Sequence, residues 1–256
     1  MIIEGNITIN GTKQNPVIFD KKDKNNWKGI YIYNAKERSL LKNVSFKNVK
    51  NIDFGILNLT GSINFYKSDV TMKNVTIENV DAEDALNIIN SNFKIDSIKI
   101  LNTSSDAIDF DFSNGHLASG LFKNIKGDGL DYSGSITNIE NINFYNISDK
   151  SISAGEESFL KIKNVYSEKS FIGIAVKDGS KVEIIDAKFK NIMKYALMTF
   201  KKKEFYDYPI LEAKNITYDD SDKLFMSQKG SSLIINKEKK TEQDFNINTI
   251  YAKWKI

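Results

Sequence analysis

An internal repeat of 22 residues is the feature that most constrains the fold of this chain. The segment DAIDFDFS, which begins at Asp106, aligns with DGLDYSGS, which begins at Asp128. Repetition at a fixed period of this size is typical of solenoids, in which each unit buries its apolar side only by stacking on its neighbours. The matching apolar position recurs at steps of 22 or 23 residues, at Leu86, Ile108, Leu130, Ile152, Ile174 and Leu197.

Apolar and polar residues alternate within each repeat, which predicts short strands rather than helices. Asparagine adopts the left-handed backbone conformation more readily than other non-glycine residues, and a stacked amide can bond to its neighbour. We therefore predict an all-β fold, a single-stranded parallel β-helix of about nine to ten coils with a structural Asn ladder. The ladder column consists of Asn48, Asn79, Asn102, Asn124, Asn146, Lys169 and Asn191.

One domain accounts for residues 1–256. Residues 1–26 are expected to form an N-terminal edge coil or cap, 27–232 the coils, and 233–256 a C-terminal cap that covers the open end. In the early coils Gly29-Ile30, Gly55-Ile56 and Ala85-Leu86 are assigned to one repeat position, so the loops between them carry insertions. The aromatic residues expected to pack in the core include Phe110, Phe112 and Tyr132.

Composition limits the partners of the chain. It has no cysteine and a formal net charge of only +3. Its lysines are spread along the repeats rather than gathered with aromatic residues on one stripe, so no nucleic-acid partner is expected. No apolar run is long enough to span a membrane.

The N-terminus shows no signal peptide, because Met1 is followed by strand-like alternation rather than a basic and an apolar segment. This is compatible with a cytoplasmic protein. It is also compatible with a fragment of a secreted or cell-surface protein, in which other domains of a longer chain would be partners.

The coils, the Asn column and the small residues Gly129 and Gly173 before the strands resemble the right-handed parallel β-helices of the pectate-lyase-like group, over residues 27–232. The resemblance implies a right-handed coil, and that architecture serves lyases, hydrolases, epimerases, phage tailspikes and adhesins. The phrases SDAIDFDFSNG, GDGLDYSGS, SDKSISAGEES and GIAVKDGS are also similar to β-helix modules that accompany spore-coat-kinase-like domains in some bacterial proteins. This second resemblance implies a module of undefined role.

Carboxylates gather on the side of the strands that faces outward. Equivalent residues of stacked coils lie about 4.8 Å apart, so Asp109, Asp111 and Asp131 are expected to share one patch. Lys177 is two coils from Asp131, at roughly 10 Å by the same spacing, and Lys150 follows the preceding turn. Crowded carboxylates are unfavourable unless a cation, a shared proton or a lysine compensates for their charge.

Three interpretations of this patch stay open. In the first, the chain is a polysaccharide lyase or epimerase, resembling the calcium-dependent β-helix lyases. Calcium held by Asp109, Asp111 and Asp131 would neutralise a uronate, and Lys177 or Lys150 would take the proton, with Asp131 in the same catalytic centre. The sequence shows no exact motif of that family and no arginine near the patch.

In the second interpretation two of the three aspartates act as acid and base, resembling the polygalacturonase-like hydrolases, although the Asp-Asp order of that family with a nearby His and Arg is missing. In the third, the chain is a non-catalytic binding or structural module of a larger bacterial surface or envelope protein. There Asp106 and Asp128 bond within turns, and Asp109 and Asp131 pair with Lys150 and Lys177.

The expected ligand is an extended, anionic polysaccharide, because a long parallel sheet matches a long polymer. A catalytic cleft would have walls formed by the insertions near residues 60–83 and 203–209. The one histidine, His116, is expected in a solvated turn. Substrate contacts are expected from Asp128, Ser153, Glu156, Asp178, Lys201, Lys202 and Tyr206.

Overall fold

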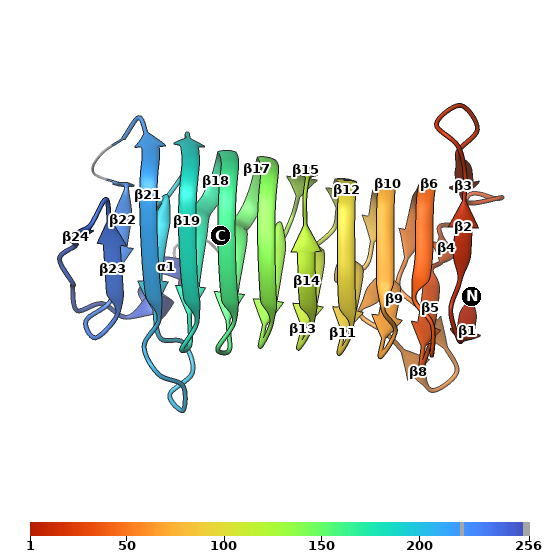
Figure 1. The fold of residues 1–256 in the computed structure, drawn as a ribbon, viewed down its shortest axis with the longest axis horizontal. Coiled ribbons are helices and arrows are strands. Elements are labelled where there is room, and N and C mark those ends of the chain that lie inside the picture. Colours follow the sequence, from red (N-terminus) through yellow and green to blue (C-terminus); the bar gives the residue numbers. More distant parts are fainter. Residues whose placement is uncertain (221–222, 253–256) are drawn as a thin grey trace.

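The computed structural model describes residues 1–220 and 223–252 of the chain. It forms a parallel β-solenoid of about 9 turns that are about 23 residues apart. The coils stack along the long axis, from β1 near the N-terminus to β24 at the opposite end (Figure 1). The prediction of a parallel β-helix with this period is confirmed.

One side of the solenoid is a column of short strands, each paired in parallel with the equivalent strand of the next coil. We call it the short-strand column. Its members are β1 (Ile2–Glu4), β5 (Ile30–Tyr33), β9 (Gly61–Tyr66), β11 (Asp84–Ile89), β13 (Asp106–Asp111), β16 (Leu130–Ser133), the last residues of β17 (Ile136–Gly155) and β18 (Phe159–Lys177), β20 (Leu197–Phe200) and β22 (Phe225–Ser227).

The rest of each coil belongs to longer strands that bend around the core, and these also pair in parallel. This long-strand column consists of β2 (Thr8–Asn10), β3 (Val17–Phe19), β4 (Trp27–Lys28), β6 (Ser39–Lys50), β10 (Val70–Asp81), β12 (Asn92–Thr103), β14 (Asn114–Leu117), β15 (Gly120–Ile125), the first parts of β17 and β18, β19 (Lys181–Lys190), β21 (Ile210–Tyr218) and β23 (Ser232–Ile235).

The core lies inside the coils, where the predicted apolar column from Leu86 to Leu197 is fully buried. Phe93, Phe110 and Tyr132 stack along the axis with ring centroids 4.4 and 4.7 Å apart. The prediction that Phe112 packs in the core is wrong. It follows the last residue of β13 with a φ of 48°, and this turn leaves the ring 58% exposed.

The predicted Asn ladder is confirmed. Every member has a positive φ, and each amide from Asn79 to Asn146 donates to the preceding member at 2.9 to 3.3 Å. At the N-terminal end Asn48 donates to the carboxylate of Asp20 at 2.7 Å. A further ladder was not predicted, in which serine hydroxyls accept from the backbone N–H of the serine one coil earlier, at Ser68, Ser91, Ser113, Ser135, Ser158 and Ser180.

The repeat position assigned to Gly55-Ile56 is wrong. Ile30 pairs with Ile63, which pairs with Leu86, so between Ile30 and Leu86 the long step lies between β5 and β9 and the next step is regular. Gly55 and Ile56 instead form the turn of an inserted hairpin of β7 (Asp53–Phe54) and β8 (Leu57–Asn58). The expected wall at residues 60–83 is wrong for the same reason, since those residues build regular strands.

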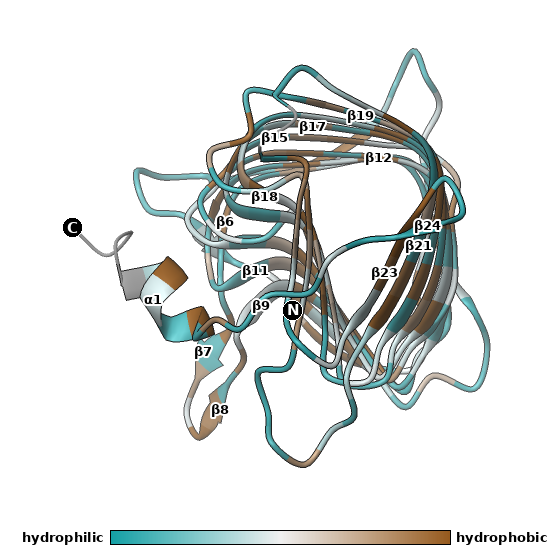
Figure 2. Ribbon diagram, turned by 90° about the vertical axis from the view of Figure 1, so that its left-hand side faces the viewer, coloured by the Kyte–Doolittle hydropathy of each residue, from teal (hydrophilic) through white to brown (hydrophobic). Residues whose placement is uncertain are grey.

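Both ends carry additional structure. Residues 1–26 form the first coil through β1, β2 and β3, while β23 still pairs in parallel before β24 (Glu238–Lys239) turns back on it. Helix α1 (Ile247–Ala252) follows, and residues 253–256 of the predicted cap lie outside the described residues. Viewed along the axis, α1 and the β7–β8 hairpin project from the side where β9 and β11 lie (Figure 2). No helix in the described ranges is long and apolar enough to cross a membrane.

Candidate functional site

The outward side of the short-strand column changes in chemistry from one end to the other. Parallel register aligns one residue from each coil into a central row, because equivalent positions pair strand by strand. Its side chains run from aromatic through amide, carboxylate and hydroxyl to apolar. The row consists of Tyr31, Asn64, Asn87, Asp109, Asp131, Ser153, Ala175 and Met198.

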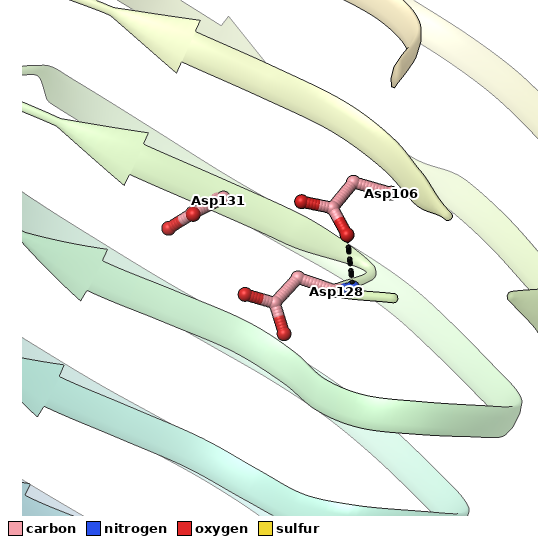
Figure 3. A group of neighbouring side chains, drawn as sticks. All are labelled: Asp106, Asp128 and Asp131. Carbon is pink, nitrogen blue, oxygen red and sulfur yellow. Dashed lines mark hydrogen bonds between the residues drawn. The ribbon is translucent and has the colours of Figure 1, made fainter. Parts of the chain in front are cut away.

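Three carboxylates converge in the middle of this face. The side chains of Asp106, Asp128 and Asp131 each place one oxygen within 4.8 Å of the others (Figure 3). The sequence predicts a different set, Asp109, Asp111 and Asp131. Register brings Asp109 beside Asp131. Asp111 lies at the far end of β13, whereas Asp106 is the first residue of β13 and Asp128 lies in the turn before β16.

Hydrogen bonds between coils hold Asp106 and Asp128 in place. Asp106 Oδ1 accepts from the backbone N–H of Asp128 at 2.7 Å, and Asp128 Oδ1 accepts from the backbone N–H of Lys150 at 2.9 Å. The sequence predicts bonds within the turns. The same residues instead link each turn to the next coil, which fixes their side chains against the face.

Lys150 is buried between two carboxylates. Its Nζ donates to Asp128 Oδ1 at 2.9 Å and to Asp149 Oδ2 at 2.6 Å. Burial disfavours its charge, but the nearby carboxylates outweigh burial and hold the pKa of Lys150 well above its usual value. A lysine fixed as an ammonium is a poor proton acceptor, and it pairs with Asp128 rather than with Asp109 as the third interpretation expects.

Lys177 is the second lysine at the centre. Its Nζ lies 4.0 Å from Asp131 Oδ1, although the residues are two coils apart, because its side chain extends back across the face. Lys202 is exposed, and its pKa is lowered by partial desolvation and by the charges of Lys177 and Lys150. Three lysines therefore border the carboxylates on the C-terminal side.

Burial and mutual repulsion raise the pKa values of these carboxyl groups. Burial, reinforced by Asp111 and other acidic neighbours, raises the pKa of Asp109 to about 9. Burial and the charge of Asp128 raise the pKa of Asp106 to about 8. Both groups therefore carry a proton at neutral pH. The pKa values of Asp84 and Asp128 are each raised to about 6, again chiefly by burial.

Two buried polar atoms lie next to the carboxylates in the central row. Asn87 Oδ1 and Ser153 Oγ have no hydrogen-bond partner among the described protein groups. Asn87 pairs in register with Asp109, and Ser153 with Asp131. Buried polar groups without a protein partner are uncommon, so both are suited to meet a ligand. The sequence predicted Ser153 but missed Asn87 and Asp84, which occupy the same repeat columns as Asp109 and Asp106.

The other predicted contacts lie in the loop of residues 201–209, which follows β20, or bond to it. The buried carboxylate of Asp178 accepts from the backbone N–H groups of Lys202 and Lys203 at 2.6 and 2.8 Å, so it holds the loop in place. Glu156 forms an ion pair with Lys203. The loop therefore lies where a late wall was predicted.

The remaining two predicted contacts interact within this loop. The Lys201 ammonium lies 4.5 Å from the ring centroid of Tyr208, and Tyr206 packs on Phe205 with ring centroids 4.5 Å apart. His116, on the long-strand column, is 3.6 Å from Glu140 and takes no part in the carboxylate centre.

The C-terminal part of the face is covered. Residues of the α1 segment, among them Ile250 and Tyr251, pack on an outward apolar cluster of Phe171, Ile172, Ala175, Met198 and Phe200. The ring of Tyr251 also lies 5.6 Å from Lys150 Nζ. Helix α1 therefore covers this face on β18 and β20, next to Lys150.

Comparisons with known proteins give no family. No protein-family model and no curated protein matches the chain. Among solved structures, the chain is similar to the catalytic domain of a GH87 alpha-1,3-glucanase in complex with nigerose, with a TM-score of 0.44 and 10% identity. A variant of that domain in complex with tetrasaccharides gives a TM-score of 0.42 and 10% identity. Each alignment covers 92% of this chain and 63% of the other, so the chain spans less than two thirds of their length.

Proposed function

We propose that the outward face of the short-strand column binds an extended glycan and hydrolyses its glycosidic bonds, with Asp109 as general acid and Asp131 as nucleophile. One observation carries this proposal. A carboxyl group that stays protonated at neutral pH, Asp109, lies in register beside a second, half-buried carboxyl group on the next strand. Two carboxyl groups in different environments are what acid–base glycoside hydrolysis requires.

In the proposed reaction Asp109 gives its proton to the glycosidic oxygen as the bond from that oxygen to the anomeric carbon breaks. Asp131 forms a transient ester bond to the anomeric carbon as the glycosidic bond breaks, because neighbours in register lie too close for a water molecule between them. Water then displaces Asp131 from that carbon and gives its proton to the Asp109 carboxylate. Lys177, 4.0 Å from Asp131, pairs with it in the resting state. The buried ion pairs of Lys150 keep Asp128 and Asp149 in place beside the reacting groups.

A hydrolase with this face is suited to an uncharged glycan. Asp84, Asp106, Asp109, Asp111 and Asp131 all border the path along the row. The ionised members would repel a polyuronate, and the protonated Asp106 and Asp109 add no positive charge to hold one. The hydrolase proposal therefore replaces the anionic ligand that the sequence suggests by a neutral one.

A calcium-dependent lyase or epimerase is the second candidate, because the oxygens of Asp106, Asp128 and Asp131 already converge within 4.8 Å. Hard oxygen ligands of this kind suit calcium, which would offset the repulsion and neutralise a uronate carboxylate. In this candidate Lys177 rather than Lys150 is the proton acceptor. The ion pair of Lys150 with Asp128 counts against it, since that ammonium already compensates for the charge of the Asp128 carboxylate.

The test is an assay of reducing ends and of ultraviolet absorbance on neutral glucans, mannans and xylans and on uronic-acid polymers, with calcium or with a chelator. We expect calcium-independent cleavage of a neutral polymer, reduced at least about 100-fold by Asp109→Asn and by Asp131→Asn. Asp96→Asn, on the long-strand column, is the matched control. Unsaturated products that require calcium would favour the lyase, and no cleavage of any polymer would leave a non-catalytic module.

A further inference from the structure

We infer that Tyr31, Tyr33 and Tyr66 form a sugar-stacking subsite that binds a linear, uncharged glycan at a distance from the carboxylate centre. The inference rests on the proposed function for the class of ligand. It adds a binding site and a minimum length of glycan that engages the whole face.

The three tyrosines form one aromatic surface on the outward side of β5 and β9. The rings of Tyr31 and Tyr33 stack with centroids 5.0 Å apart and an angle of 14° between their planes. Tyr66 pairs in register with Tyr33 on the next coil. Burial and the closeness of Tyr66 and Tyr33 raise the pKa of Tyr31, as expected for phenols that crowd together.

These rings are not part of the core. The core side chains of the same strands are Ile30, Ile32, Ile63 and Phe65, whereas the three tyrosines are each only partly buried. The Tyr33 hydroxyl lies 3.4 Å from Glu4, and the Lys67 ammonium lies over the face of the Tyr66 ring, 5.3 Å from its centroid. Because the rings of Tyr31 and Tyr33 stack on each other, the surface that they offer to a ligand consists of an outer ring face and the hydroxyl edges.

Such a surface matches the chemistry of a pyranose ring, which has apolar C–H groups on its faces and hydroxyl groups around its edge. Tyrosine combines a large apolar face with a hydrogen-bonding hydroxyl, so it can meet both parts of a sugar. The carboxylate centre lies further along the face. The aromatic surface would therefore bind a part of the glycan that does not react.

The central row connects the two places. Tyr31, Asn64, Asn87 and Asp109 are successive members, so the aromatic surface lies three strand spacings, or about 14 Å, from the acid. Along this path Asn64 Nδ2 donates to the carbonyls of Gly61 and Ile30, while Asn87 Oδ1 is buried and has no partner among the described protein groups. An extended chain of several sugar units spans this distance, and a disaccharide does not.

The experiment measures binding by calorimetry to the Asp109→Asn protein, which is expected not to cleave its ligand. The probes are cellohexaose, laminarihexaose, maltohexaose, mannohexaose and xylohexaose, each beside its dimer. We expect at least one hexamer to bind more tightly than its dimer, and Tyr31→Ala with Tyr33→Ala to weaken that hexamer at least tenfold while dimer binding is unchanged. Tyr31→Phe with Tyr33→Phe should retain most of the affinity.

Tyr145→Ala with Tyr166→Ala is the matched control, because these rings also neighbour each other, with centroids 5.5 Å apart, but lie on the long-strand column. Equal hexamer affinity in the Tyr31/Tyr33 variant and this control would overturn the inference. So would a failure of all five hexamers to bind at millimolar concentration. Hexamer binding that depends on Tyr31 and Tyr33, together with no cleavage by the unmodified chain, would support the subsite and refute the proposed hydrolysis.

Discussion

The two halves of one outward face show how the same coil serves two purposes. From β5 to β16 the central row presents tyrosine, asparagine and aspartate, and this half stays accessible at the carboxylates. From β18 to β20 it presents Ala175 and Met198, and α1 covers it. The backbone register is continuous across both halves. The stacked strands therefore accept polar and apolar side chains alike at the outward positions. Those side chains decide whether the face stays open to a ligand or is covered by α1.

The largest effect is expected from a charge placed in the covered half. Met198→Asp would bury a carboxylate beneath α1 without a partner, so we expect the free energy of unfolding to fall by about 4 kcal/mol or the folded protein to be lost. Ser133→Asp, at a half-buried position of the accessible half, should cost less than about 1 kcal/mol. Urea unfolding of both variants measures the contrast, and equal losses would contradict the division of the face into two halves.

The next effect concerns the boundary between the halves. Lys150→Ala removes the partner of buried Asp128 and of Asp149, and we expect a loss of about 3 kcal/mol because the carboxylates remain desolvated. Lys177→Ala should cost less than about 1 kcal/mol, since Asp131 is partly exposed and the ion pair is long. The measurement is again urea unfolding at pH 7, and a Lys177 effect as large as that of Lys150 would contradict this account.

The carboxylates of the accessible half predict a dependence of stability on pH. The folded-state pKa values of Asp109, about 9, and Asp106, about 8, lie above those of an unfolded aspartate, so the folded protein binds more protons in that window. The free energy of unfolding therefore falls as pH rises from about 4 through 9.

Between pH 5 and pH 8 we expect Asp109 to account for about 2 kcal/mol of this fall, less than full linkage because the group is not completely buried. Thermal unfolding at several pH values measures it. Asp109→Asn should reduce the slope and raise the melting temperature at pH 8. An unchanged slope would show that Asp109 titrates normally.

The smallest effect is expected in the ladder, which both halves share. Asn124→Gly keeps the left-handed backbone at φ 58° but removes the side-chain bonds to Asn102 and Asn146, so we expect a loss of about 1 kcal/mol. Asn124→Ala should lose more, since it adds backbone strain. If both substitutions cost the same, the bonds alone would explain the preference for asparagine.

The period of the sequence predicted the register of the central coils because it is read from side chains that face the core. Leu86, Ile108 and Leu130 are buried, and their spacing has to match the stacking of strands. The register of the early coils was harder to predict. The hairpin tip around Gly55 and Ile56 carries the same glycine–apolar pair as a true coil, and only three-dimensional pairing separates it from Ser62-Ile63.

The sequence predicted the carboxylate site only in part, because the repeat does not give the direction in which each side chain points. Register places Asp109 beside Asp131, as the sequence predicts, but it does not say that Asp106 and Asp128 turn toward Asp131 while Asp111 stays apart. The packing of α1 over Met198 could not be predicted from the sequence either. Helix α1 has six residues, too few for a recognisable apolar stripe, and its position follows from the apolar cluster it meets.

The amides of the Asn ladder from Asn48 to Asn146 all point the same way. Each Nδ2 donates toward the N-terminal neighbour, from Asn146 to Asn124, Asn102, Asn79 and Asn48. Aligned amides polarise one another, so the row acts as a line of dipoles that runs along the solenoid and leaves partial positive charge at its first coil. Asp20 meets that end, and the hydrogen bond from Asn48 lowers its pKa. A side-chain ladder in a solenoid is thus terminated by an anion in the same manner as the N-terminus of a helix.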